Sequence, residues 1–202
     1  MLIRSASFVK SSITLNQCPE TSLPEFGFIG RSNVGKSSLI NLLTGWSGLA
    51  KISGEPGKTR TINHFLINDD WYLVDLPGYG YAKVPVKLRE KWIKDVKDYI
   101  LHRKNLLCLF VLIDSRHPPQ RSDLDFMEFL GINAVPFARV FTKSDKISGS
   151  SLRKSIQQYD YEMLKIWEIV PLTFITSTIN RKGREEILNF IEETINNLSK
   201  QV

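Results

Sequence analysis

The sequence predicts an α/β fold: a doubly wound, mostly parallel sheet of six strands with one antiparallel strand, and helices on both faces. Apolar runs of strand length alternate along the chain with longer segments of helical periodicity. A glycine-rich loop joins one of these runs to a helical segment. No repeat or interdomain linker appears, and 202 residues, 42% of them hydrophobic, suit one domain with a sizeable core. We therefore place residues 23–200 in a single domain, after an N-terminal extension of residues 1–22.

Short apolar runs bounded by polar or turn-forming residues predict the strands. The runs cover residues 25–29, 61–67, 71–75, 106–114, 137–142 and 172–176. Asn68, Asp69 and Asp70 separate the second run from the third, and such a polar spacer is typical of a hairpin turn. One of the two joined strands is therefore expected to run antiparallel to the rest of the sheet. The segment from Ile3 to Lys10 is expected to add an edge strand or to wrap the sheet.

Segments of helical periodicity predict helices at residues 36–43, 85–103, 121–130, 151–167 and 184–198. In the second helix, apolar residues recur at spacings of three and four, which predicts a buried stripe. The stripe consists of Leu88, Trp92, Val96 and Tyr99. Residues 83–104 also carry most of the net charge of +6, with eight basic and three acidic side chains. A solvated helix face and a nucleic-acid surface both explain this charge.

Composition excludes several classes of protein. The longest apolar run, from Leu106 to Ile113, is far too short to span a membrane, and the first residues lack the apolar region of a signal peptide. We therefore expect a soluble, cytoplasmic protein with no membrane insertion. Cys18 and Cys108 lie far apart and form no C-x-x-C pair, so neither a disulfide nor a zinc site is expected. Cys108, inside the apolar run, is expected in the core.

Residues 30–37 match the pattern G-x-x-x-x-G-K-[ST] of a phosphate-binding loop. An apolar run precedes the loop and a helical segment follows it, which is the context such a loop requires. Its backbone N–H groups can surround an anion, Lys36 can reach the β- and γ-phosphates, and the Ser37 hydroxyl can hold Mg²⁺. The predicted contacts are Gly30, Arg31, Ser32, Asn33, Val34, Gly35, Lys36 and Ser37. The motif indicates a nucleoside triphosphate without choosing its base; the alternative is a turn that merely begins a helix.

A second motif, D-x-x-G, follows the strand at residues 71–75. It consists of Asp75, Leu76, Pro77 and Gly78. Asp75 can support a Mg²⁺ ion directly or through water, and the Gly78 amide can approach the γ-phosphate because no side chain obstructs it. Loss of that phosphate would release the segment after Gly78, which is how GTPases switch. A simple turn is the alternative.

Thr142, Lys143, Ser144 and Asp145 form a T-K-x-D element after the strand at residues 137–142. The Asp145 carboxylate can accept two hydrogen bonds from the N1–H and amine of guanine, whereas adenine offers no such pair. The Lys143 stem can lie along the base, and Thr142 can brace the phosphate loop. Thr176, Ser177 and Thr178 end the last strand. Their backbone amides can contact the guanine O6, although an ordinary polar loop explains them as well.

The loop between the first two motifs should supply a second Mg²⁺ ligand. It contains Gly57, Lys58, Thr59, Arg60 and Thr61. A threonine hydroxyl can ligate the metal while its backbone senses the γ-phosphate. Thr59 and Thr61 both qualify, and their spacing does not decide between them.

With these five elements in order, the chain resembles the translation-factor-related GTPases. It is more closely similar to the EngB (YihA/YsxC) family of ribosome-biogenesis GTPases, in the TrmE-Era-EngA-EngB-Septin-like group. The specific stretches lie at residues 30–41, 56–61, 75–82 and 114–119, and the tyrosine-glycine repeat after D-x-x-G is the most distinctive. The resemblance implies a Ras-like, EngB-type G domain that binds GTP, GDP and Mg²⁺. It also implies a role in large ribosomal subunit assembly and a requirement for normal cell division and septation.

Carried over by position, the resemblance makes Ser37 and Thr59 the Mg²⁺ ligands and Lys36, Thr59 and Gly78 the catalytic residues. Ras-like enzymes position the attacking water with a glutamine after D-x-x-G, but this chain has Tyr79 there, so slow intrinsic hydrolysis is expected. A partner, or K⁺ near Asn33, would then stimulate hydrolysis. Asn33 resembles the potassium-binding asparagine of related GTPases; a loop residue bonding its own backbone is the alternative.

The basic helix leads us to expect the large ribosomal subunit or its rRNA as the partner. We expect a monomer, and we do not expect DNA binding. Two other functions stay open. A P-loop ATPase or small-molecule kinase would need adenine or acceptor recognition, against which Asp145 argues. A non-catalytic, nucleotide-dependent division scaffold is compatible with Tyr79. Arg116, in the fourth stretch, is expected to have a structural role in its loop rather than that of an arginine finger.

Overall fold

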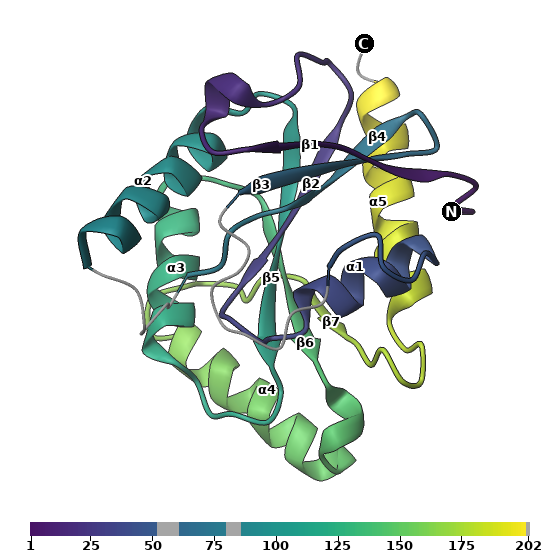
Figure 1. The fold of residues 1–202 in the computed structure, drawn as a ribbon. Coiled ribbons are helices and arrows are strands. Elements are labelled where there is room, and N and C mark those ends of the chain that lie inside the picture. Colours follow the sequence, from purple (N-terminus) through teal and green to yellow (C-terminus); the bar gives the residue numbers. More distant parts are fainter. Residues whose placement is uncertain (52–60, 80–85, 201–202) are drawn as a thin grey trace.

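The computed structural model describes residues 1–51, 61–79 and 86–200, without the side chains of residues 86–92 and 199 (Figure 1). Several predictions therefore lie outside the described residues. They concern Gly57, Lys58, Thr59 and Arg60, and the side chains of Leu88 and Trp92. Among the described helices, none is long and apolar enough to cross a membrane.

The sheet has seven strands in the described residues. These are β1 (Ala6–Ser12), β2 (Glu25–Gly30), β3 (Ile62–Ile67), β4 (Trp71–Asp75), β5 (Leu106–Asp114), β6 (Phe137–Thr142) and β7 (Thr173–Ile175). Their order is β1-β3-β4-β2-β5-β6-β7. Among the described strands only β3 runs antiparallel to the rest of the sheet, which confirms the one predicted antiparallel strand. At the β3–β4 hairpin, Asn68 and Asp69 adopt φ of 52° and 57°, as a tight hairpin turn requires.

The sheet has one strand more than the six predicted, because the segment from Ile3 to Lys10 forms an edge strand, β1, which was one of the two outcomes expected for it. This strand pairs with β3 from Ala6 opposite Ile67 to Ser12 opposite Ile62, within the segment assigned to the N-terminal extension. Five of its seven residues are exposed. Its pairing therefore depends on backbone hydrogen bonds at a sheet edge rather than on an apolar run, so hydrophobic patterning did not mark it as firmly as the other strands.

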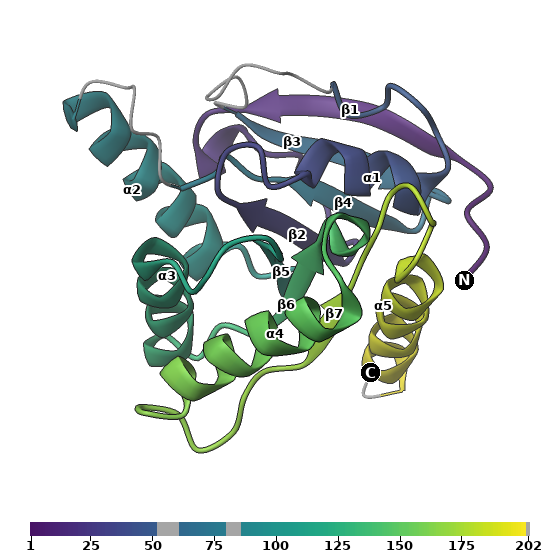
Figure 2. The same cartoon turned by 90° about the horizontal axis from the view of Figure 1, so that it is seen from below.

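Helices cover both faces of the sheet, as predicted (Figure 2). They are α1 (Lys36–Thr44), α2 (Val86–His102), α3 (Arg121–Ile132), α4 (Gly149–Met163) and α5 (Arg184–Ser199). Short 3₁₀ turns occupy Leu15–Gln17 and Ser144–Lys146. On one face α1 and α5 pack against the sheet, and on the other α2, α3 and α4 do. The fourth helix ends four residues earlier than predicted, where the amides of Ile166 and Trp167 turn back to the Met163 carbonyl.

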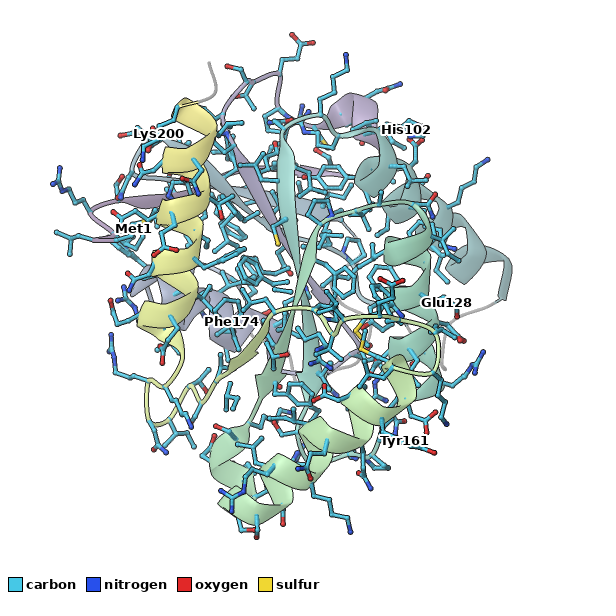
Figure 3. All side chains as sticks on the ribbon, turned by 180° about the vertical axis from the view of Figure 1, so that it is seen from behind. Met1, His102, Glu128, Tyr161, Phe174 and Lys200 are labelled. Atoms are coloured by element: carbon cyan, nitrogen blue, oxygen red, sulfur yellow. The ribbon has the colours of Figure 1, made fainter. Side chains whose placement is uncertain are left out.

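Aromatic side chains fill the core between the sheet and α5 (Figure 3). Phe174 of β7 lies 6.0 Å from Phe110 and 5.7 Å from Phe190, measured between ring centroids. On the opposite face, Val96 and Tyr99 of α2 are buried, as the predicted stripe requires, and Cys108 is buried in β5. Both cores hold the parallel strands in place, so the loops at their carboxyl ends meet along one edge of the sheet.

Candidate functional site

The phosphate loop connects β2 to the first turn of α1. Gly35 precedes the helix with φ of 103°, a conformation that a side chain would strain. At Gly30, a Cβ atom would lie 2.8 Å from the backbone oxygen of Leu112 on β5, so only glycine fits there without a shift. Asn33 also adopts a left-handed conformation, with φ of 62°, which asparagine tolerates better than most residues. The loop backbone is thus shaped to end at a helix N-terminus, where N–H groups favour an anion.

Lys36 and Asp75, from two different motifs, are in contact. The Lys36 ammonium forms a buried hydrogen-bonded ion pair with the Asp75 carboxylate at the end of β4. Burial lowers the pKa of Lys36 to about 7. Lys36, predicted to bind phosphate, and Asp75, predicted to support Mg²⁺, therefore lie together where β4 ends and α1 begins. Ser37 is the next residue in the first turn of α1.

The T-K-x-D element holds the phosphate loop from the other side. The Thr142 hydroxyl donates to the Val34 carbonyl at 2.6 Å, which is the bracing contact expected from the sequence. Lys143 adopts φ of 57°, and its ammonium donates to the Asn33 carbonyl at 2.6 Å and to the Asp114 carboxylate at 2.9 Å. The hydrogen bonds to Val34 and Asn33 therefore join the end of β6 to the phosphate loop, although the paired residues lie more than one hundred positions apart in the sequence.

Asp145 is held with its carboxylate ionised. The Ser177 hydroxyl donates to its Oδ1 at 2.7 Å, and this hydrogen bond lowers the pKa of Asp145. A carboxylate in this state can accept the paired donors of guanine. Beside it lies a small cleft of about 70 Å³ between the phosphate loop, the T-K-x-D element and the loop after β7. The cleft is lined by Gly35, Ser38, Leu39, Thr142, Lys143, Thr176 and Thr178.

The loop after β7 offers fewer donors than its sequence suggested. The amide of Thr176 donates to the Phe141 carbonyl and that of Ser177 to the Lys182 carbonyl. Thr178 is therefore the remaining candidate of the three for a backbone contact with the base. Thr61 begins the segment leading into β3, and its hydroxyl donates to the Asn63 side chain at 2.8 Å. Its competitor as metal ligand, Thr59, lies outside the described residues.

Arg116 is bound within its own loop. Its guanidinium donates to both carboxylate oxygens of Asp114, at 2.9 and 2.7 Å. Although burial raises it, the pKa of Asp114 is held well below its usual range by hydrogen bonds from Arg116 and Lys143. This arrangement matches the structural role expected of Arg116.

Sequence reasoning missed two buried side chains next to the site, Asp123 of α3 and Tyr159 of α4. Asp123 is fully buried and lies 3.3 Å from the Arg31 guanidinium of the phosphate loop. The Tyr159 hydroxyl donates to Asp123 at 2.8 Å. A single acidic residue in the first turn of a helix resembles an ordinary helix-dipole contact, so the pattern carried no signal of this pairing.

A phosphate loop, a D-x-x-G segment and a T-K-x-D element at one edge of such a sheet define the class of P-loop GTPases. Comparisons with known proteins support the class. Residues 25–143 match a protein family described as "50S ribosome-binding GTPase". A crystal structure of a probable GTP-binding protein engB superposes with a TM-score of 0.69 at 25% identity, covering 86% of this chain and 99% of that one.

Two curated relatives are probable GTP-binding proteins EngB. The one from Porphyromonas gingivalis is 54% identical over 192 residues, which is 95% of this chain and 96% of the relative. The one from Bacteroides thetaiotaomicron is 54% identical over 202 residues, covering 100% and 98%. The chain therefore belongs to the EngB family of GTP-binding proteins, as the motifs indicated. It binds GTP and GDP and hydrolyses GTP, as this family does.

Proposed function

We propose that the protein is a slow, Mg²⁺-dependent GTPase switch that acts in assembly of the large ribosomal subunit. The observation that carries the slow rate of hydrolysis is the position of Tyr79. Its ring is 8% exposed and stacks on Phe126 of α3, with 4.4 Å between ring centroids. A side chain packed in this way holds no water for attack on the γ-phosphate, so intrinsic hydrolysis is slow.

The residues present suit a magnesium ion. Hydroxyl and carboxylate oxygens are the ligands that Mg²⁺ prefers, and Ser37 and Asp75 supply them at the ends of neighbouring elements. Ser37 and Thr59 would hold the ion, with Asp75 in support. When bound, Mg²⁺ neutralises charge on the β- and γ-phosphates. Lys36 adds a second positive charge at the phosphates, and the Gly78 backbone leaves room for the γ-phosphate.

Two activators are proposed for this slow hydrolysis, a ribosomal partner and K⁺. The Asn33 side chain is exposed on the phosphate loop, where its oxygen is open to a monovalent cation. Asparagine at this position has a second explanation that needs no cation, because asparagine tolerates the left-handed backbone that Asn33 adopts. Comparing the rate of hydrolysis in KCl and NaCl separates the two explanations.

The proposed partner is the large ribosomal subunit or its rRNA. The family description and the basic residues of α2 support it. The basic surface is smaller than the sequence suggested, because Arg103 is engaged by buried Glu25 and Lys97 lies over the Phe129 ring at 4.3 Å. Lys94 and Lys104 are exposed. Division and septation defects would follow from a shortage of ribosomes.

Charge reversal tests this partner. Replacing Lys87, Lys91 and Lys94 with glutamate should weaken sedimentation with 50S particles and leave GDP affinity unchanged, because phosphate contacts are lost away from the nucleotide. The same change at three exposed lysines elsewhere, Lys154, Lys182 and Lys200, is the matched control. Equal sedimentation of the two triple variants would assign the binding surface to another part of the protein.

A further inference from the structure

A buried carboxylate on α3 joins the phosphate loop to the helices behind it. Asp123 is fully buried, and its two oxygens face different elements. Its Oδ1 lies 3.3 Å from Nε of Arg31, the second residue of the loop, and its Oδ2 accepts a hydrogen bond of 2.8 Å from Tyr159 of α4. Gln120 strengthens the connection, because its side-chain oxygen accepts from Arg31 at 3.4 Å and its backbone N–H donates to the Tyr159 hydroxyl at 3.2 Å.

The residue that follows D-x-x-G reaches the same place. The backbone of Tyr79 pairs with that of Arg31 in a parallel β-bridge. The ring stacks on Phe126, which lies three residues after Asp123 and therefore on the same face of α3. Burial and the adjacent Asp123 carboxylate raise the pKa of Tyr79 well above its usual range, so the phenol keeps its proton.

Two buried oxygens near this junction lack a hydrogen bond among the described residues: the Tyr79 hydroxyl and Oδ1 of Asp123. Tyr79 is thus held by its backbone bridge to Arg31 and by stacking on Phe126, while the Asp123 carboxylate itself pairs with Arg31 and Tyr159. A negative charge out of water requires such partners, since an unpaired buried carboxylate is strongly destabilising. The position of Arg31, and with it that of the backbone bridge to Tyr79, therefore depends on the charge of Asp123.

We propose that Asp123 is a positioning residue for GTP hydrolysis: it fixes Arg31 against α3 and, through the backbone bridge between Arg31 and Tyr79, sets the end of the D-x-x-G segment against the phosphate loop. The inference rests on the GTPase activity of this same site. Asp123 acts on the reaction only through these two residues. Rates of enzymatic reactions fall by roughly 100-fold when a reacting group is misplaced by about 1 Å, so a loosened junction should reduce turnover more than binding.

The test is Asp123→Asn in the full chain, which keeps the shape of the side chain and removes its charge. We expect kcat for GTP hydrolysis to fall by about tenfold or more, while KM and the affinity for a fluorescent GDP analogue change by less than about threefold. Asp125→Asn is the matched control, because Asp125 lies on the same helix but pairs with Arg121 at the surface. Its kcat should equal that of the wild type.

Arg31→Gln, alone and combined with Asp123→Asn, separates positioning from general loss of structure. If Asp123 acts through Arg31, the double variant has the kcat of the Asp123 variant alone. Effects on kcat that multiply, or an unchanged kcat in Asp123→Asn, would overturn the proposal. Arg31 is partly exposed, so its single variant is expected to fold and must itself show a lowered kcat. Wild-type hydrolysis in the same assay reports separately on the GTPase function.

Discussion

Replacing Glu25 with glutamine should destabilise the protein more than any surface change. Glu25 begins β2, the strand that leads into the phosphate loop, and it is fully buried. Arg103, just after the end of α2, donates to its Oε1 at 2.5 Å, and Asn105 donates to the same oxygen at 3.1 Å. Tyr99 of α2 donates to Oε2. The carboxylate thus ties α2 to the amino-terminal end of β2, the end of the strand that lies away from the phosphate loop.

The magnitude follows from the pKa of Glu25. Burial raises it, but the adjacent His64 imidazole and the hydrogen bonds from Arg103 and Tyr99 together lower the pKa of Glu25 from 4.5 to about 2. A shift of this size corresponds to about 3 kcal/mol of stability. Because the folded-state pKa is the lower one, the contribution is complete above pH 4.5 and is lost as the pH falls toward 2.

Urea unfolding followed by circular dichroism measures this contribution. At pH 7, Glu25→Gln should lower the free energy of unfolding by about 3 kcal/mol, since Arg103 loses its buried partner. At pH 3 the difference from the wild type should narrow by about 2 kcal/mol, because the wild-type carboxylate is then almost fully protonated in the unfolded state but still mostly ionised in the folded state. Glu185→Gln, at an exposed ion pair, is the control and should change stability by less than about 0.5 kcal/mol. A loss below about 1 kcal/mol for Glu25→Gln, or a difference independent of pH, would refute the reasoning.

Three further predictions concern the nucleotide site. Thr142→Val removes the hydroxyl that braces the Val34 carbonyl and should weaken GDP binding about fivefold in a fluorescence titration, the equivalent of one hydrogen bond of about 1 kcal/mol; unchanged affinity would show that the brace is dispensable. Asp145→Asn should weaken GDP binding by about 100-fold, since the charged acceptor for guanine is lost; retained affinity for GDP over ADP would place base recognition elsewhere. Hydrolysis should be faster in KCl than in NaCl. Asn33→Gly keeps the left-handed backbone and should abolish that difference. Equal wild-type rates in the two salts would exclude activation by K⁺.

Most of the fold could be predicted because its signals are local. The apolar runs of β4, β5 and β6 match the observed strands residue for residue, since buried parallel strands are continuously hydrophobic. The phosphate loop, D-x-x-G and T-K-x-D could be placed for a related reason, because each follows such a strand and parallel strands bring their carboxyl ends together. β1 is exposed along most of its length, so its pairing depends on a neighbour far along the chain.

The buried charges of Glu25 and Asp123 could not be predicted. Their partners, Arg103 and Arg31, lie 78 and 92 positions away in the sequence, and nothing local distinguishes these carboxylates from surface acids. Arg103 shows the consequence, because its sequence position predicts a place on the basic surface of α2, whereas its side chain is mostly buried against Glu25. The tertiary fold, rather than residue type, decides which charged side chains face water.

Sedimentation with purified 50S particles, in the presence of a non-hydrolysable GTP analogue or of GDP, tests the nucleotide-controlled switch. The helix α2 begins eight residues after Gly78 in the sequence, so in the proposed switch the γ-phosphate alters how the basic helix is presented. We expect more protein in the pellet with the GTP analogue than with GDP, and a decrease in both as salt is raised. Equal sedimentation with the two nucleotides would contradict a switch that acts on the large subunit.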